Sequence, residues 1–224
     1  MFNKANTKLI TLSFIMLAVF SISAQAAFHD SRVKKWEFFL APQVINSKAL
    51  QFEHGSEANI SKRSSLAFGF GYNLNAHIEL GGRFSSSSSS MSGTIIKDDA
   101  ENTAEQFTSN LYTSSINFDF TYNIFSGPFT PYITANLGYT YLDSGIPTGN
   151  IGTGCGWYFG WYYCGPVAQT FTSNEFNYGA GVGLRYDFNR KLYIKGGAAK
   201  NYIDLNSTNT PDFTIYQFII GFMF

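Results

Sequence analysis

Large apolar residues alternate with small or polar residues along most of the chain. Between Ser64 and Leu74 the apolar set is Leu66, Phe68, Phe70, Tyr72 and Leu74, and the intervening set is Ala67, Gly69, Gly71 and Asn73. A period of two predicts a β-strand. One face of this strand is uniformly large and apolar, which is typical of a strand whose outer face meets lipid.

Seven further segments alternate in the same way. They cover residues 35–45, 77–84, 112–124, 131–141, 176–188, 192–199 and 213–224. Segment 192–199 shows the pattern least clearly, because Gly196 and Ala198 fall on its apolar face. The segments are about as long as the 9 to 11 residues that a tilted strand needs to cross a bilayer.

Only a closed sheet satisfies every backbone hydrogen bond in lipid. Eight such segments therefore predict an all-β fold, an eight-stranded antiparallel up-and-down transmembrane β-barrel. The alternative is a secreted β-sandwich, whose aromatic residues would face a second sheet.

The connections between these segments alternate between short and long. Short ones lie at 73–76, 126–128 and 189–190, and long ones at 46–63, 85–110, 142–174 and 200–212. In outer-membrane barrels the short turns are periplasmic and the long loops extracellular, so we expect both termini in the periplasm and four surface loops. The serine run 85–90 has low complexity, and we expect it to be mobile.

Residues 1–26 have the features of a secretory signal peptide. Two lysines precede an apolar run at 9–23, which is too short to span a bilayer comfortably, and Ala24-Gln25-Ala26 follows as a small-x-small cleavage pattern. We expect this segment to be removed, leaving a barrel domain at 27–224. The alternative is an N-terminal anchor that is retained. Export would expose the two cysteines of the chain to oxidising conditions.

Composition and charge narrow the function further. Only 13% of the residues are charged, and 15 basic residues balance 15 acidic ones, so no basic excess is available to neutralise phosphates and nucleic acid is not an expected partner. The histidines at 29, 54 and 77 are dispersed, and the sequence predicts no enzyme, no cofactor and no metal site. The acids Asp98, Asp99, Glu101 and Glu105 either bind a divalent cation or are simply solvated.

Strand parity places both signs of charge inside the barrel. The inward acids are Glu37, Glu79, Asp119 and Asp187, and the inward bases are Arg83, Arg185 and Lys195. Eight strands enclose a lumen that side chains can fill, and buried charges are tolerated when they are paired. We therefore expect a salt-bridged plug. The functional alternative for the same residues is a gated path for protons or small ions.

The third long loop places six aromatic residues between two cysteines. The cysteines are Cys155 and Cys164, and the aromatic residues are Trp157, Tyr158, Phe159, Trp161, Tyr162 and Tyr163. A disulfide here would close a ten-residue loop and stabilise it by roughly 2.5 to 3 kcal/mol. Tyrosine and tryptophan dominate binding hot spots, so this tip is a candidate site for a host or surface ligand. The alternative is that the rings pack on one another or on lipid headgroups.

The chain resembles the eight-stranded outer-membrane barrels of the opacity-protein family and the membrane domain of outer-membrane protein A. The residues that carry the resemblance are Gly69 to Asn75, Pro131 to Tyr139, Gly179 to Tyr186, and a terminal strand with Tyr216, Phe218, Ile220, Phe222 and Phe224 on one face. The resemblance implies that this last strand is the signal recognised by the outer-membrane assembly machinery. It also implies a bacterial outer-membrane location, with lipid and lipopolysaccharide around a monomeric barrel.

This family includes adhesins, serum-resistance factors and structural proteins, so the resemblance predicts architecture better than activity. We expect a non-enzymatic barrel that displays four extracellular loops and serves surface binding, adhesion or envelope integrity. The alternative is a small porin-like channel for small or hydrophobic solutes, similar to outer-membrane protein W.

Overall fold

The computed structural model describes residues 32–52, 55–96, 104–158, 161–205 and 210–224. The strands are β1 (Trp36–Ile45), β2 (Lys48–Gln51), β3 (Glu57–Ile60), β4 (Arg63–Asn73), β5 (Ile78–Ile96), β6 (Ala104–Asn123), β7 (Phe129–Tyr158), β8 (Trp161–Asp187), β9 (Leu192–Ile203) and β10 (Asp212–Met223). The part of the chain that is described contains no helix long and apolar enough to cross a membrane.

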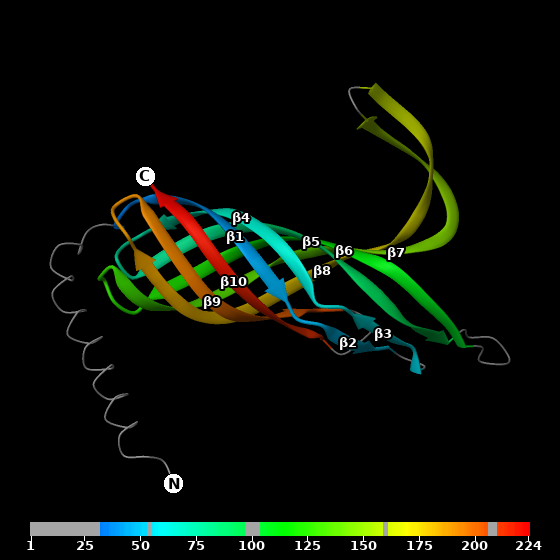
Figure 1. Cartoon of the computed structure of the whole chain (residues 1–224), viewed down its shortest axis with the longest axis horizontal. Helices are drawn as coiled ribbons and strands as arrows, with labels where there is room; N and C mark the ends of the chain where they lie inside the picture. The colour runs from blue at the N-terminus through cyan, green and yellow to red at the C-terminus, as the bar shows by residue number, and fades with distance from the viewer. Residues whose placement is uncertain (1–31, 53–54, 97–103, 159–160, 206–209) are drawn as a thin grey trace, which may run out of the picture.

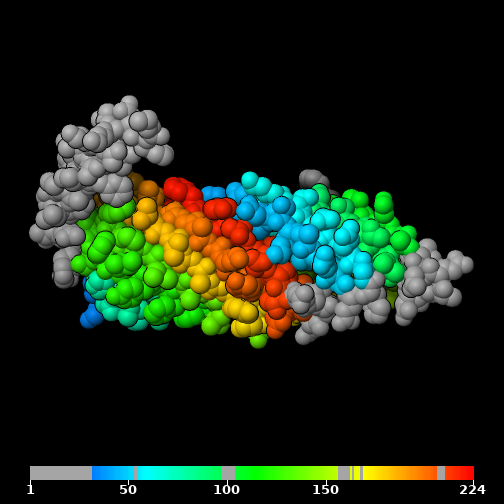
Figure 2. Space-filling model, turned by 90° about the horizontal axis from the view of Figure 1, so that it is seen from below, coloured from blue at the N-terminus to red at the C-terminus, as the bar shows by residue number. Residues whose placement is uncertain are grey.

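Eight of these strands form a closed antiparallel barrel. Each of β4 to β9 pairs with the next strand along the chain, and β1 pairs with both β4 and β10. The predicted eight-stranded barrel is therefore confirmed (Figure 1). In Figure 2 strands β9 and β10, in orange and red, cross the surface as oblique bands, as the tilt of strands in a closed barrel requires.

The two ends of the barrel differ. The short-turn end carries the β4–β5, β6–β7 and β8–β9 turns, together with the start of β1 and the C-terminus. The long-loop end carries the β2–β3 hairpin and the outer parts of β5 to β8, of which the β7–β8 hairpin reaches farthest from the barrel (Figure 1).

Two of the four predicted long loops are wrong in their local structure. Most of 85–110 and of 142–174 extends the strands, because β5 pairs with β6 from Ile78 to Ile96 and β7 pairs with β8 as far as Tyr158. The serine run 85–90, which we expected to be mobile, lies within β5 between β4 and β6. Serine tolerates this position because every second hydroxyl faces outward while the backbone makes the ladder.

The first long loop contains a small hairpin that the sequence did not predict. Strands β2 and β3 pair with each other, and β3 continues onto β5. Segment 192–199, the least clear in sequence, is part of β9, which pairs with both β8 and β10 without a bulge. The outward Gly196 leaves the backbone ladder intact.

The outer surface of the barrel is apolar. The outward residues include Leu40, Phe70, Ile116, Leu137 and Val182, each at least 46% exposed. Several rings pair across neighbouring strands, such as Phe38 with Phe70 at 5.3 Å between centroids. Hydrocarbon around the barrel would remove these apolar faces from water, so no second layer of protein is needed to cover them.

Aromatic rings inside the barrel lie over glycines that are their register partners on the neighbouring strand. Tyr193 is fully buried, and a Cβ at Gly221 would approach its Cζ to 2.1 Å. Gly69 in the same way accommodates Phe39, and Gly183 accommodates Tyr132. The lumen is thus filled by fitted side chains rather than left open.

Gly221→Ala should destabilise the barrel by about 1 to 3 kcal/mol, because its methyl group overlaps the Tyr193 ring. Urea unfolding in phospholipid vesicles, followed by the heat-modifiable shift on a gel, measures the change. The control is Gly196→Ala, whose added Cβ meets nothing within 4 Å and should leave the midpoint unchanged. Equal midpoints for the two variants would contradict the predicted overlap.

Candidate functional site

A buried ion cluster crosses the lumen near the short-turn end. Arg185, on β8, donates to Glu37 at 2.6 Å, to Asp187 at 2.7 Å and to Glu79 at 3.0 Å. Its guanidinium also lies 4.1 Å from the centre of the Tyr193 ring. Four strands therefore meet at one side chain that is itself fully buried.

Two further cations extend this cluster along the lumen. Lys195 donates to both carboxylate oxygens of Glu79 at 2.7 Å, and Arg83 binds Asp119 at 2.9 Å. The structure thus brings all seven of the sequence-predicted lumen charges into ion pairs across the barrel.

Arg32 belongs to the same cluster and was missed by sequence reasoning. It lies before β1, turns into the short-turn end, and binds Asp187 at 3.0 Å and the carbonyl oxygen of Ala76 at 3.3 Å. It also donates to the carbonyl oxygen of Gly127. Burial lowers the pKa of its guanidinium, and the nearby charge of Arg185 acts in the same direction. The neighbouring carboxylates raise that pKa but do not offset the decrease. The predicted set of four acids and three bases carried one unmatched acid, and that imbalance was the available signal for a fourth base.

The middle of the lumen is polar and tightly filled. Two small cavities lie there, with volumes of about 50 and 30 Å³. Serine, threonine and asparagine side chains line the larger one, and the smaller one lies against Glu79, Arg83 and Lys195. The larger has room for roughly three or four water molecules and the smaller for about two.

A much larger apolar cavity lies at the long-loop end. This loop-end cavity has a volume of about 650 Å³, within the range typical of sites for small molecules. Its apolar lining is Leu50, Phe52, Ala58, Ile60, Met91, Ile95, Phe107, Leu111, Leu142, Ile146, Phe171, Ile203, Leu205 and Phe213. Ile95 and Phe171 are themselves 38% and 60% exposed, so the cavity reaches the surface.

The lining forms because the apolar face of the wall changes sides along the strands. On β5 the outward residue Phe84 is followed by outward serines at 86, 88 and 90, while the inward positions become apolar at Met91. The hairpin β2–β3 adds Leu50 and Ile60 to the same apolar interior. Sequence reasoning missed this cavity because it treated these segments as loops.

A buried cation, Arg63, lies at the inner end of the loop-end cavity. Arg63, the first residue of β4, lines both this cavity and the polar cavity beneath it. Its Nε donates to the Ser87 hydroxyl at 3.2 Å, and its guanidinium lies 5.3 Å from the centre of the Phe213 ring. Strand parity carries the signal for this residue, because it continues the inward row of β4.

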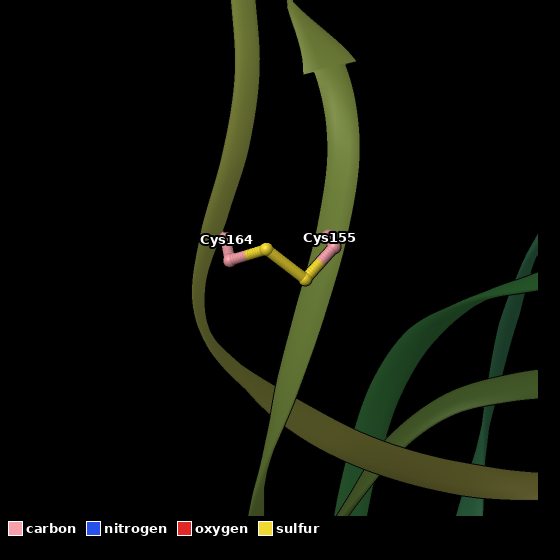
Figure 3. Close-up of a disulfide and its surroundings, with 2 residues drawn as sticks. All are labelled: Cys155 and Cys164. Atoms are coloured by element: carbon pink, nitrogen blue, oxygen red, sulfur yellow. A yellow bond between two sulfur atoms is a disulfide. The ribbon is translucent and has the colours of Figure 1, made fainter.

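A disulfide joins Cys155 and Cys164 across the β7–β8 hairpin (Figure 3). The two residues are register partners with Cα atoms 4.0 Å apart. Of the six aromatic residues between them, Phe159 lies outside the described residues. The backbone of Trp157, Tyr158, Trp161 and Tyr163 continues the two strands, and Tyr162 is 62% exposed.

The terminal strand, the histidines and the loop acids were the other residues that the sequence singled out. Tyr216, Phe218, Ile220 and Phe222 point outward from β10, and Phe224, which follows the strand, is also exposed. His77 contacts the carbonyl oxygen of Asn123 at 2.8 Å and stacks on Tyr122 at the short-turn end. Within the described ranges no group of three or more histidine, cysteine or acidic residues could hold a metal ion, and residues 98, 99 and 101 lie outside those ranges.

Arg185→Met should destabilise the barrel by about 3 to 5 kcal/mol, because three buried carboxylates would lose their shared cation. The temperature at which the folded band disappears on a semi-native gel gives the measurement. Arg190→Met, at an exposed turn position, is the control and should not change that temperature. A double change of Arg83 and Arg185 to alanine that leaves heat resistance intact would contradict a stabilising role for the cluster.

Comparison with known proteins places the fold. The family model for the outer membrane protein beta-barrel domain matches residues 12–224. Among solved structures, OprG from Pseudomonas aeruginosa has a TM-score of 0.52 at 11% identity, over 88% of this chain and 99% of that chain. At this identity the likeness shows the fold alone.

Two further structures are similar to a smaller degree. Neisserial surface protein A has a TM-score of 0.49 at 15% identity, over 83% of this chain and 95% of that chain. Ail from Yersinia pestis, in complex with the heparin analogue sucrose octasulfate, has a TM-score of 0.49 at 9% identity, over 86% and 100%. Comparison with curated proteins gives no match. The family match over nearly the whole chain shows that this protein belongs to the outer membrane protein beta-barrel family of the bacterial outer membrane.

Proposed function

We propose that this protein is a non-enzymatic surface-binding barrel that captures a small hydrophobic molecule in its loop-end cavity. The observation that carries the proposal is an apolar cavity of about 650 Å³ above a closed, ion-paired lumen. Outer-membrane barrels expose their long loops to the outside, so this cavity would face the environment of the cell. Both termini would then lie in the periplasm.

The apolar lining favours a hydrophobic ligand over a sugar or an ion. Fourteen of the lining residues are apolar, and they include Leu111 and Met91, which are themselves buried. Releasing water from such a surface contributes about 25 cal/mol for each Å² that the ligand buries. A polar solute would lose its hydration without matching hydrogen bonds from these side chains.

The closed lumen favours capture over conduction. A porin-like channel, the other function considered for this sequence, needs a path past Arg185 and its three carboxylates. The cavities in that region hold about 50 and 30 Å³, too little for a solute of the size that the loop-end cavity admits. No group of described residues points specifically to a role in envelope integrity.

N-phenyl-1-naphthylamine, a neutral fluorescent probe, should bind the protein in lipid nanodiscs, above the signal of empty nanodiscs. Ala58→Trp should reduce that binding at least about tenfold, because its indole ring would occupy the cavity. The control is Asn59→Trp on the same strand, whose side chain is exposed outside the cavity. Planar bilayers containing the protein should show no steady conductance.

If both tryptophan variants bind the probe equally well, the probe binds outside the loop-end cavity. Steady single-channel conductance by the unmodified protein would favour the channel instead.

A second candidate function is adhesion through the β7–β8 hairpin. The hairpin projects well beyond the barrel, and a disulfide fixes its two strands to each other (Figure 1). Fixing a loop before binding lowers the entropy lost when it meets a partner.

Cells that display a variant with Cys155 and Cys164 both changed to serine should bind host-matrix coated surfaces several-fold less than cells with the unmodified protein. The barrel should keep its heat-modifiable shift, since the disulfide lies beyond the ladder of the other strands. Attachment to surfaces is counted under flow, with and without reductant. Undiminished attachment by the serine variant, at equal surface display, would dismiss adhesion by this hairpin.

A further inference from the structure

Arg63 differs from the other buried arginines of the described residues. Arg32, Arg83 and Arg185 each contact a carboxylate at 3.0 Å or less. Arg63 is only 8% exposed, yet it has no ion-pair partner among the described residues. Its Nη1 is buried and makes no hydrogen bond within that part of the chain.

The unpaired guanidinium of Arg63 lies at the boundary between two cavities. Arg63 lies where the loop-end cavity meets the polar cavity beneath it. The contacts with Ser87 and with the Phe213 ring hold the guanidinium in place, and Nη1 has no hydrogen-bond partner in the described part of the chain. A preorganised guanidinium beside an apolar wall is suited to bind one anionic oxygen group.

We propose that the ligand of the loop-end cavity carries a single anionic headgroup, a carboxylate, on an apolar body, and that Arg63 binds the headgroup. This inference rests on the proposed capture function and specifies its substrate class. A carboxylate would supply the missing partner of the buried cation, and the apolar body would cover the walls around Met91 and Leu111.

The charged residues that line the cavity favour a single anionic group, placed at Arg63. Glu57 and Glu175 are the other charged residues of the lining, so Arg63 is its sole positive group among the described residues. Glu175 accepts a hydrogen bond from the Ser173 hydroxyl. Two acids disfavour an anionic headgroup elsewhere in the cavity and disfavour a second anion beside the first.

The test compares two probes that share a chain and differ in the headgroup. Decanoate and decan-1-ol are titrated by calorimetry into the protein in nanodiscs of neutral phosphatidylcholine at neutral pH, and the heats from empty nanodiscs are subtracted. The unmodified protein should bind decanoate about 10- to 100-fold more tightly than decan-1-ol, as a charge-assisted hydrogen bond predicts.

Arg63→Met should abolish this preference while decan-1-ol binds as before. Arg63→Lys should keep part of it, because the charge remains but the planar group is lost. The matched control is Lys62→Met, which removes the neighbouring exposed positive charge and should keep the full preference. The heat-modifiable shift reports whether each variant is folded.

The outcomes separate the two proposals. Equal affinity of the unmodified protein for both probes would overturn the inference about the headgroup and would leave capture of hydrophobic molecules standing; this comparison needs no variant. A preference that survives Arg63→Met in folded protein would also overturn it. Binding of neither probe would overturn the capture function itself, and with it the inference.

Discussion

The wall of this barrel meets two different solvents along its length, and the solvent outside decides which face of each strand is apolar. Around the lipid band the large side chains point outward and the lumen is polar and charged. Beyond that band the outward side chains of β5 become serine, and the inward ones become apolar at Met91. The plug and the loop-end cavity are two results of this one change of sides, because each face must match the medium that it touches.

The sequence predicted the lipid-spanning part of the fold well. Alternation alone located eight strands within a few residues of their ends at the short-turn end, since the terminal positions such as Asn73 and Asp187 coincide with turns. The extensions of β5 to β8 and the hairpin β2–β3 were missed. Once a strand leaves the membrane, its outer face is polar and its inner face apolar, so a search for outward aromatic residues reports a loop. Serine-rich strands are hardest to find, because serine marks neither face.

The site was predicted unevenly for a related reason. Parity was enough to select the charges that converge on Arg185, because a lumen position is defined by alternate residues within one strand. Arg32 lies before the first strand and Arg63 lies at the edge of a predicted loop, so parity was not applied to either. Arg32 pairs with Asp187 of β8, and Arg63 contacts the Phe213 ring of β10, so the closure of the barrel brings these groups together.

The different pairing of the cations at the two ends of the lumen also explains why a closed barrel suits capture. Arg32 has its carboxylate within the protein and Arg185 has three, and leaving one such buried charge without its partner costs about 3 to 5 kcal/mol. Arg63 has none among the described residues, and a ligand that reaches it breaks no existing ion pair of that part of the chain. A ligand burying about 200 Å² of apolar surface would gain roughly 5 kcal/mol. That gain is large enough for binding, but it is comparable with the loss of a single ion pair of the plug. The same molecule can therefore occupy the cavity without opening the barrel beneath it.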